Sequence, residues 1–178
     1  IIEIFKGPAD SMYGAGTGGL ILINNLDRWQ PGASLEYITG SYKLQNVFAS
    51  ARFGQKENKN QFTFAHNQSD GYRVQSKMRR DNFSWISQLK LSAKQQLTAS
   101  LLFSDMYYQT PGALTLTEYN TDPSLARPAA GGFPSAINAK AAIWQKNITA
   151  GFTNHYQFNT HFANTTTFYG TFNQVKNS

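Results

Sequence analysis

The sequence predicts an all-β fold made of antiparallel strands of the transmembrane-barrel type, and three observations predict it. Segments of about ten residues alternate apolar and polar side chains. Only 15% of the 178 residues are charged, whereas 14% are aromatic, which suits strands with one apolar and one uncharged polar face. The connections between these segments also differ strongly in length, as they do in outer-membrane barrels.

Two short strands are expected first, at residues 1–5 and 20–23. The segment 6–19 between them contains Gly7-Pro8 and four further glycines (Gly14, Gly16, Gly18 and Gly19). Proline and glycine at this density predict tight turns rather than a helix. A phosphate-binding loop is disfavoured, because no Gly-Lys-Ser/Thr follows and no helical pattern opens after the glycines.

Seven longer strands are expected after residue 25. Clear alternation marks 45–53, 81–92, 96–107 and 144–154, and weaker alternation marks 33–41, 61–68 and 160–173. In 96–107, Leu101 and Phe103 share a face opposite Ser104, and Asp105 interrupts the apolar face near its end. Soluble antiparallel sheets alternate too, so this pattern by itself leaves the surroundings of the sheet open.

The connections favour a membrane barrel. They are short at 40–44, 93–95 and 157–159, long at 68–80 and 108–142, and intermediate at 54–60. This near-alternation predicts short periplasmic turns and long extracellular loops. Several aromatic residues lie close to expected strand ends, where they suit either an interfacial girdle or an ordinary core: Trp29, Trp85, Trp144, Tyr107 and Tyr108.

Composition argues against several other classes of protein. The absence of cysteine excludes disulfides and Cys-ligated metal. The net charge of +6 is spread over expected turns and loops, which disfavours nucleic-acid binding. His66, His155 and His161 are isolated, and no close carboxylate pair or nucleophile arrangement suggests an enzyme, a metal site or a cofactor. The chain opens inside a strand-like segment without an initiator Met, so we expect it to belong to a longer protein.

The first 24 residues carry a longer motif. It reads Ile2-Glu3-Ile4-Phe5-Lys6-Gly7-Pro8, then Ser11-Met12-Tyr13-Gly14, then Gly18-Gly19 and an apolar strand that ends at Asn24. This motif resembles the signature that closes the plug domain of TonB-dependent outer-membrane receptors. The resemblance implies that residues 1–25 end a plug domain and that 26–178 form the first seven or so strands of an incomplete transmembrane β-barrel.

The resemblance also implies which residues form the motif that locks the plug against the barrel: Glu3, Lys6, Gly7, Pro8, Tyr13, Gly14, Gly18 and Gly19. Within this motif, the strand Glu and the basic residue take part in the locking ion pairs. The family usually has Arg where this chain has Lys6. Because Arg forms a bidentate fork with carboxylates and Lys is a point charge, we expect a different locking geometry here.

Two further segments resemble siderophore-type members. Residues 69–73, followed by 80–83, resemble the second extracellular loop and the next strand, and 110–129 resembles the third loop of the ferric-citrate-like branch. The resemblance implies an iron-transport receptor in the outer membrane of a Gram-negative bacterium. Its ligand would be a ferric siderophore or similar chelate, and its partners TonB with ExbB and ExbD and outer-membrane lipid. No resident cofactor is implied.

The long loop 108–142 is the candidate ligand contact, through Tyr119, Asn120, Arg127 and Phe133. Arg pairs with anionic chelates, and aromatic side chains cover their organic framework. Three alternatives stay open. Instead of contacting ligand, the loop would only cap the barrel. Instead of a ferric chelate, the transported substrate would be a cobalamin or an oligosaccharide. Instead of a receptor fragment, the chain would be a soluble β-sandwich binding module.

Overall fold

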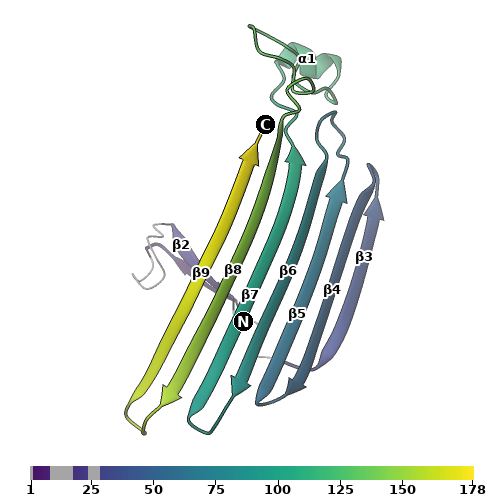
Figure 1. Ribbon diagram of the computed structural model, residues 1–178. Coiled ribbons are helices and arrows are strands. Elements are labelled where there is room, and N and C mark those ends of the chain that lie inside the picture. The colour runs from purple at the N-terminus through teal and green to yellow at the C-terminus, as the bar shows by residue number, and fades with distance from the viewer. Residues whose placement is uncertain (1, 9–17, 24–28) are drawn as a thin grey trace. The chain divides into compact units, whose positions relative to one another are not determined.

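The computed structural model describes residues 2–8, 18–23 and 29–178, and the chain divides into two compact units, Ile1–Gln30 and Pro31–Ser178. The division falls between Gln30 and Pro31, a few residues after the domain boundary expected at residue 25. Figure 1 shows the elements of both units. Each unit is described by itself below.

The first unit contains a two-stranded antiparallel sheet. Strand β1 (Ile2–Lys6) pairs with β2 (Gly19–Ile23), so that Lys6 stands opposite Gly19. Gly19 has a φ of 143°, and a Cβ there would lie 2.6 Å from the Phe5 carbonyl oxygen. A side chain at this position would therefore push the two strands apart. Tyr13 and Gly14, predicted to belong to the locking motif, lie outside the described residues.

The second unit is a seven-stranded antiparallel sheet in chain order (Figure 1). Its strands are β3 (Gly32–Gly40), β4 (Leu44–Gln55), β5 (Asn58–Ser69), β6 (Met78–Lys90), β7 (Gln95–Gln109), β8 (Ala142–Gln157) and β9 (Ala163–Asn177). The prediction of an all-β fold with seven antiparallel strands is confirmed. The described strands form an open sheet, in which β3 and β9 are the edges, and not a closed barrel.

Most strands extend beyond their predicted ends, because backbone pairing continues after the alternation of side chains fades. Three boundaries were wrong in the other direction. Ser41, expected to end a strand, lies in the turn after β3. Leu91 lies in the turn after β6, and Phe162 lies in the turn before β9, where its ring packs 5.3 Å from that of Phe158. Both side chains are apolar and in phase with their strand, so the pattern alone could not exclude them.

The registers place most of the large apolar side chains of neighbouring strands on one side of the sheet, here called the apolar face; Phe48, Ile86 and Leu102 lie on the other side. Phe62 stands opposite Trp85, Phe83 opposite Phe103, and Ile148 opposite Phe172. Ring pairs follow the same face: Phe53 stacks on Phe62 at 5.6 Å, and Phe62 stacks on Trp85 at 6.1 Å. Such pairs contribute about 0.5–1.5 kcal/mol each beyond burial of area.

The other side, the polar face, is lined by hydroxyl and amide groups that bond across the strands. Thr149 and Thr171 hydroxyls lie 3.0 Å apart, and the Asn67 amide donates to Asn46 at 3.0 Å. Thr63 and Ser84 also bond across this face. Cross-strand pairs of this kind stabilise a register, because a one-residue slip would move every side chain to the opposite face.

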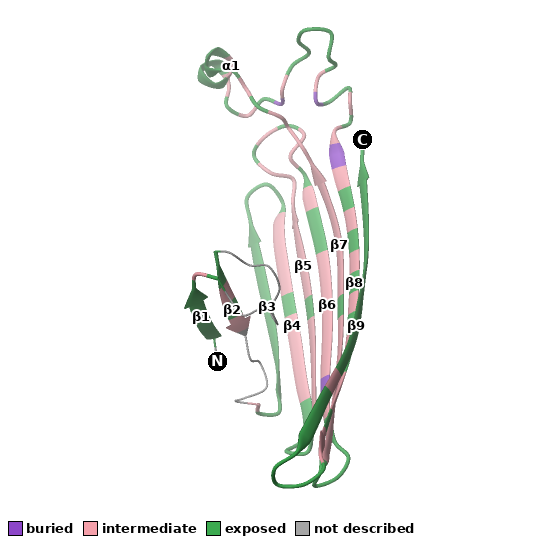
Figure 2. Cartoon of the chain, turned by 90° about the vertical axis from the view of Figure 1, so that its left-hand side faces the viewer, coloured by how far each residue is buried: buried purple, intermediate pink, exposed green. Residues whose placement is uncertain are grey.

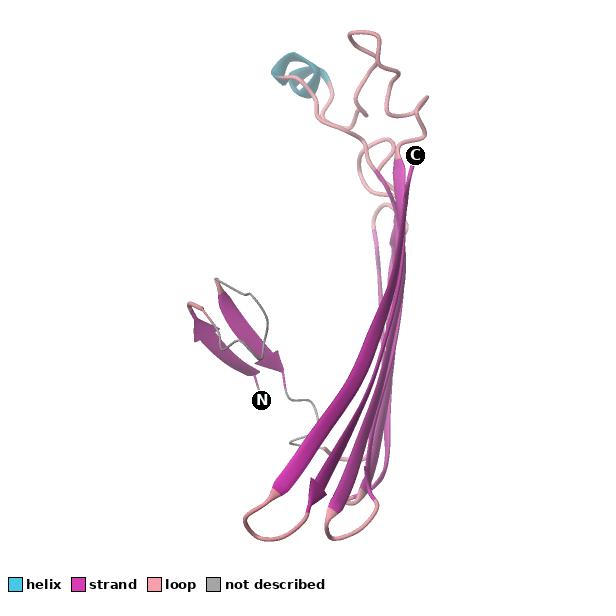
Figure 3. Cartoon of the chain, turned by 60° about the vertical axis from the view of Figure 1, so that its left-hand side comes forward, coloured by secondary structure: helices cyan, strands magenta, loops and turns pink. Residues whose placement is uncertain are grey.

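The sheet is a single curved layer (Figure 3). Among the described residues only Ser87, Ala126, Ala136 and Ala142 are buried. Along β8 exposure alternates (Figure 2): Trp144, Ile148 and Phe152 are exposed, whereas the smaller polar residues between them are half-buried. A water-facing sheet would show the reverse. Because an apolar face must be covered to be stable, this sheet needs a cover outside its own seven strands.

The connections differ at the two ends of the sheet. At one end, here called the loop end, lie 41–43, 70–77 and 110–141, and at the turn end lie 56–57, 91–94 and 158–162. The expected alternation of short and long connections along the chain is therefore only partly correct. The short turn at 40–44 lies at the same end as both long loops, and the segment 54–60, expected to be an intermediate connection, is mostly strand around a two-residue turn.

Candidate ligand site in the loops at one end of the sheet

The long loop contains one helix, α1 (Leu116–Thr121), which the sequence analysis did not predict. Thr115 caps it. The Thr115 side chain accepts from the Glu118 amide at 3.3 Å, and the Thr115 amide donates to the Glu118 carboxylate at 2.7 Å. This is a capping box. The Thr-x-x-Glu spacing is visible in the sequence and was the signal that could have revealed the helix.

The two long loops form one hydrogen-bonded unit. Arg73 of loop 70–77 donates from Nε and Nη2 to the Leu125 carbonyl, at 3.0 and 2.8 Å, and from Nη2 to the Gly112 carbonyl at 2.8 Å. The Val74 amide donates to the Ser124 carbonyl at 2.8 Å. The fork of the guanidinium thus holds two separate stretches of loop 110–141.

A groove of about 380 Å³ lies between these loops. Its lining comes from loop 70–77 and from α1 with its flanks: Tyr72, Arg73, Leu114, Thr115, Leu116, Tyr119 and Pro123. Arg73 forms no ion pair with a carboxylate in the described part of the chain. The groove therefore combines two exposed tyrosine rings with the Arg73 guanidinium, whose charge no described carboxylate neutralises although its Nε and Nη2 already donate to loop carbonyls. A positive charge beside aromatic rings suits an anionic ligand with an organic framework.

The four predicted ligand residues occupy different settings. Tyr119 lines the groove and is 55% exposed, and the neighbouring Asn120 is exposed on the same helix. The Arg127 guanidinium donates to the Pro128 and Pro134 carbonyls at 3.3 and 2.8 Å, so it holds its own loop. Phe133 is exposed beside an isolated bridge to Ala130.

Tyr72 and Arg73 were not predicted as ligand residues, although the structure groups them with Tyr119. They lie in the shorter loop, far from Tyr119 in sequence. Their segment was noted only for its resemblance to the second loop of siderophore receptors. The pairing of the two loops was the missing information.

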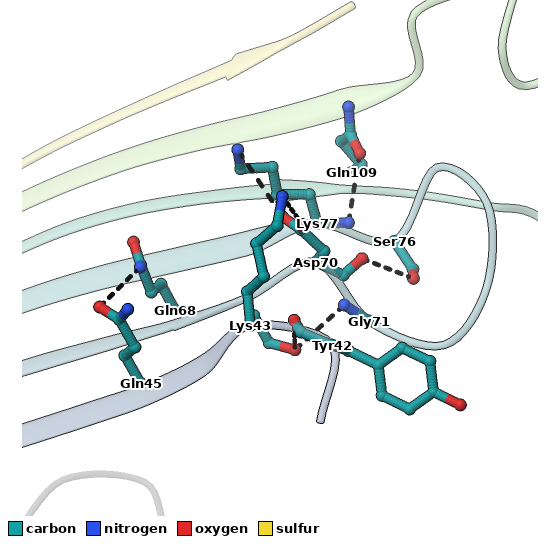
Figure 4. A network of polar contacts seen from close by, with 10 residues as sticks. Tyr42, Lys43, Gln45, Gln68, Asp70, Gly71, Ser76, Lys77 and Gln109 are labelled. Atoms are coloured by element: carbon teal, nitrogen blue, oxygen red, sulfur yellow. Dashed lines mark hydrogen bonds and ion pairs between the residues drawn. The ribbon is translucent and has the colours of Figure 1, made fainter. Parts of the chain in front are cut away.

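A charged network joins loop 70–77 to the first turn (Figure 4). Asp70 lies 2.9 Å from the Lys43 ammonium and 3.8 Å from that of Lys77, and the Asp70 amide donates to the Tyr42 carbonyl at 2.8 Å. The hydrogen bond from Lys43 holds the pKa of Asp70 below its ordinary value, and the same bond raises the pKa of Lys43. The network fixes one side of the loop unit.

The described part of the predicted locking motif lies on β1 and β2 and in their flanks. Glu3 stands opposite Leu22, and Lys6 opposite Gly19. Gly7 has a φ of 92°, as expected for a tight turn. Pro8 follows it, and Gly18 immediately precedes β2. Their role in locking stays a prediction.

No group of His, Cys, Asp or Glu side chains among the described residues is arranged to hold a metal ion. None of the helices in that part of the chain has the length and apolar character needed to cross a membrane.

Comparison with known proteins does not identify the chain. No model of a protein family matches it, and no curated protein matches it.

Proposed function

We propose that this chain is part of a TonB-dependent outer-membrane receptor that imports a ferric siderophore or a similar iron chelate. TonB, with ExbB and ExbD, would supply the energy from the inner membrane. Residues 1–25 would end the plug domain, and the seven strands would be part of the barrel wall. The chain would act as a transporter and not as an enzyme.

The distribution of side chains over the sheet carries this proposal. On β7 the apolar face runs from Leu97 through Leu101 to Phe103, about 20 Å at ~3.3 Å per residue. At the ~40° strand tilt of outer-membrane barrels, that length spans roughly 15 Å of an apolar band that is ~25 Å tall. Beyond Asp105, Tyr107 continues the same face toward the edge of the band. The polar face carries mainly hydroxyl and amide groups, as the inside of such a barrel does. A soluble sandwich would instead turn its aromatic face toward a second sheet.

The groove at the loop end supports the substrate class. A ferric chelate is anionic in many forms, and the Arg73 guanidinium, unpaired with any described carboxylate, offers it charge. Tyr72 and Tyr119 offer flat surfaces to its framework. The same two rings would also stack on a sugar, so an oligosaccharide is the second candidate.

Neighbouring cysteines can test the membrane assignment, because the chain has no cysteine of its own. Leu101 lies on the apolar face, and Leu102 lies on the polar face. In the intact protein in its membrane, we expect a fluorescent label on the Leu101→Cys variant to be quenched by nitroxide lipids. The label on Leu102→Cys would be spared. Equal quenching at both positions, or recovery of the protein in a soluble fraction, would refute the assignment.

A growth assay tests the substrate. In a deletion strain under iron limitation, the intact gene should restore growth on one ferric chelate. Tyr119→Ala should weaken binding of that chelate by about 1–2 kcal/mol, roughly five- to thirtyfold. Thr117→Ala on the same helix, outside the groove, should leave binding unchanged. Rescue by cobalamin or an oligosaccharide, with no response to any chelate, would contradict iron transport.

A further inference from the structure

The ionisable side chains of the apolar face gather at one end of it. They lie in the two rows of cross-strand partners nearest the loop end. One row contains His66, Asp81, Asp105 and Lys146, and the next contains Arg79 and Lys176. Asp105 lies 3.7 Å from Arg79 and 3.6 Å from Lys146, and Asp81 lies 3.3 Å from Arg79. The rest of that face on the seven strands is apolar or neutral.

Four residues at the β8 and β9 end of these two rows form a compact block, here called the basic hollow. Trp144 pairs with Lys176 and Lys146 pairs with Gln174 across β8 and β9, and together they line a hollow of about 390 Å³. Direct cross-strand partners have Cβ atoms about 5 Å apart. Two ammonium groups, an amide and an indole therefore converge within one small area.

The basic hollow has spare positive charge. Lys146 shares Asp105 with Arg79 at distances well beyond a short ion pair, and Lys176 forms no ion pair in the described part of the chain. The Trp144 ring packs 5.2 Å from that of Tyr107. Lys and Trp side chains together at the edge of an apolar surface are typical of the interface between lipid chains and headgroups.

The surface below the basic hollow limits what can bind there. Ile148, Phe152, Phe168 and Phe172 lie on the same two strands and the same face, and all four are exposed. A small anion would match only the two lysines. An amphiphile with an anionic headgroup would match the lysines and the four apolar side chains at once.

We propose that the basic hollow binds the phosphate headgroup of an anionic lipid whose acyl chains lie along Ile148, Phe152, Phe168 and Phe172. This rests on the proposed membrane location of the sheet. The ammonium groups of Lys146 and Lys176 pair with the phosphate oxygens, and the Gln174 amide donates a further hydrogen bond. Bound lipid then covers the outer surface of β8 and β9 at the height where the loops begin.

The test uses the intact protein in detergent, with native mass spectrometry of retained lipid. Phosphatidylglycerol is compared with phosphatidylcholine of the same chains. A lysine at an anionic lipid surface strengthens binding about fivefold, so Lys146→Gln with Lys176→Gln should reduce phosphatidylglycerol retention roughly 25-fold. The pair Lys56→Gln with Lys94→Gln removes the same charge at the turn end and should retain the preference.

Three results would overturn the proposal. They are equal retention of both lipids by the unmodified protein, an equal loss in the control pair, and displacement of the lipid by inorganic phosphate at the same concentration. The last would indicate a site for a free anion. Quenching of the label at position 101 is measured separately. If that label is quenched and lipid preference is absent, the headgroup site fails while the membrane location stands.

Discussion

Replacing Arg73 with Met should release loop 110–141 from loop 70–77. The guanidinium donates three hydrogen bonds to two carbonyl oxygens, those of Leu125 and Gly112. A hydrogen bond from a charged donor contributes about 1.5–3 kcal/mol. Because Arg73 is partly exposed and water can replace it, we take the lower limit for each carbonyl. The docking of the loops should therefore weaken by about 3 kcal/mol, roughly 150-fold in the opening equilibrium.

Hydrogen exchange at the Val74 amide measures this opening, because that amide donates to the Ser124 carbonyl across the two loops. Its exchange should accelerate roughly 150-fold, whereas amides in the middle of β6 and β7 should keep their exchange rates. Arg73→Lys retains the charge but not the fork, so it should recover only part of the protection.

The control is Arg80→Met. The Arg80 guanidinium donates to the Met106 sulfur at 3.2 Å, a weak acceptor, and does not bond to the long loop. It should leave the Val74 amide protected. An unchanged exchange rate in Arg73→Met would refute the reasoning, since the loops would then be held together by other contacts.

Three further predictions concern the turns and the end of strand β4. The Asp70 ion pair with Lys43 should be fully present above the ordinary carboxyl pKa of 3.8, and it should be lost as pH falls through the lowered pKa of Asp70. At high pH the pair should persist past 10.5, because the pKa of Lys43 is raised. Hydrogen exchange of the amide at position 70 measures both transitions, and Asp70→Asn should abolish them. Gly54→Ala should destabilise the sheet by about 1–3 kcal/mol in denaturant unfolding, because φ is 115° and a Cβ would overlap the Asn58 carbonyl; Gly170→Ala, in open space, is the control, and equal effects would contradict the argument. Tyr42→Asn should stabilise by about 1 kcal/mol, because Tyr42 has a φ of 56° and Asn tolerates this conformation; a lower unfolding midpoint would count against it.

The strands were predictable from sequence because period-two alternation is a local property. Phe103 and Ser104 already stood on opposite sides in the sequence pattern, and the structure keeps them there. The exact ends were less predictable, since Leu91 and Phe162 are in phase with strands that they do not join. Hydrogen bonding to the neighbouring strand, which sequence alone does not show, decides where a strand stops.

The candidate site was predictable only in part. Tyr119 could be selected from its own loop, but its neighbours Tyr72 and Arg73 are brought to it by the pairing of β6 with β7 and by bonds to distant carbonyls. Arg127 and Arg73 show what the sequence could not indicate: both guanidinium groups donate to backbone carbonyls of the loops. Ligand contact by Arg127 stays a prediction. Backbone acceptors carry no signal in a sequence.

Asp105 shows how an exception in the pattern becomes informative. In the sequence it only interrupts an apolar face. In the structure Arg79 and Lys146 share its carboxylate, and these charges cross β6, β7 and β8 within two adjacent rows of cross-strand partners. Charges on a lipid-facing surface are costly at mid-depth and inexpensive near the interface. In the proposed membrane location, the restriction of these charges to the loop end would mark that end of the apolar face as the one near the membrane interface. The loops, the groove and the basic hollow lie at the same end of the sheet.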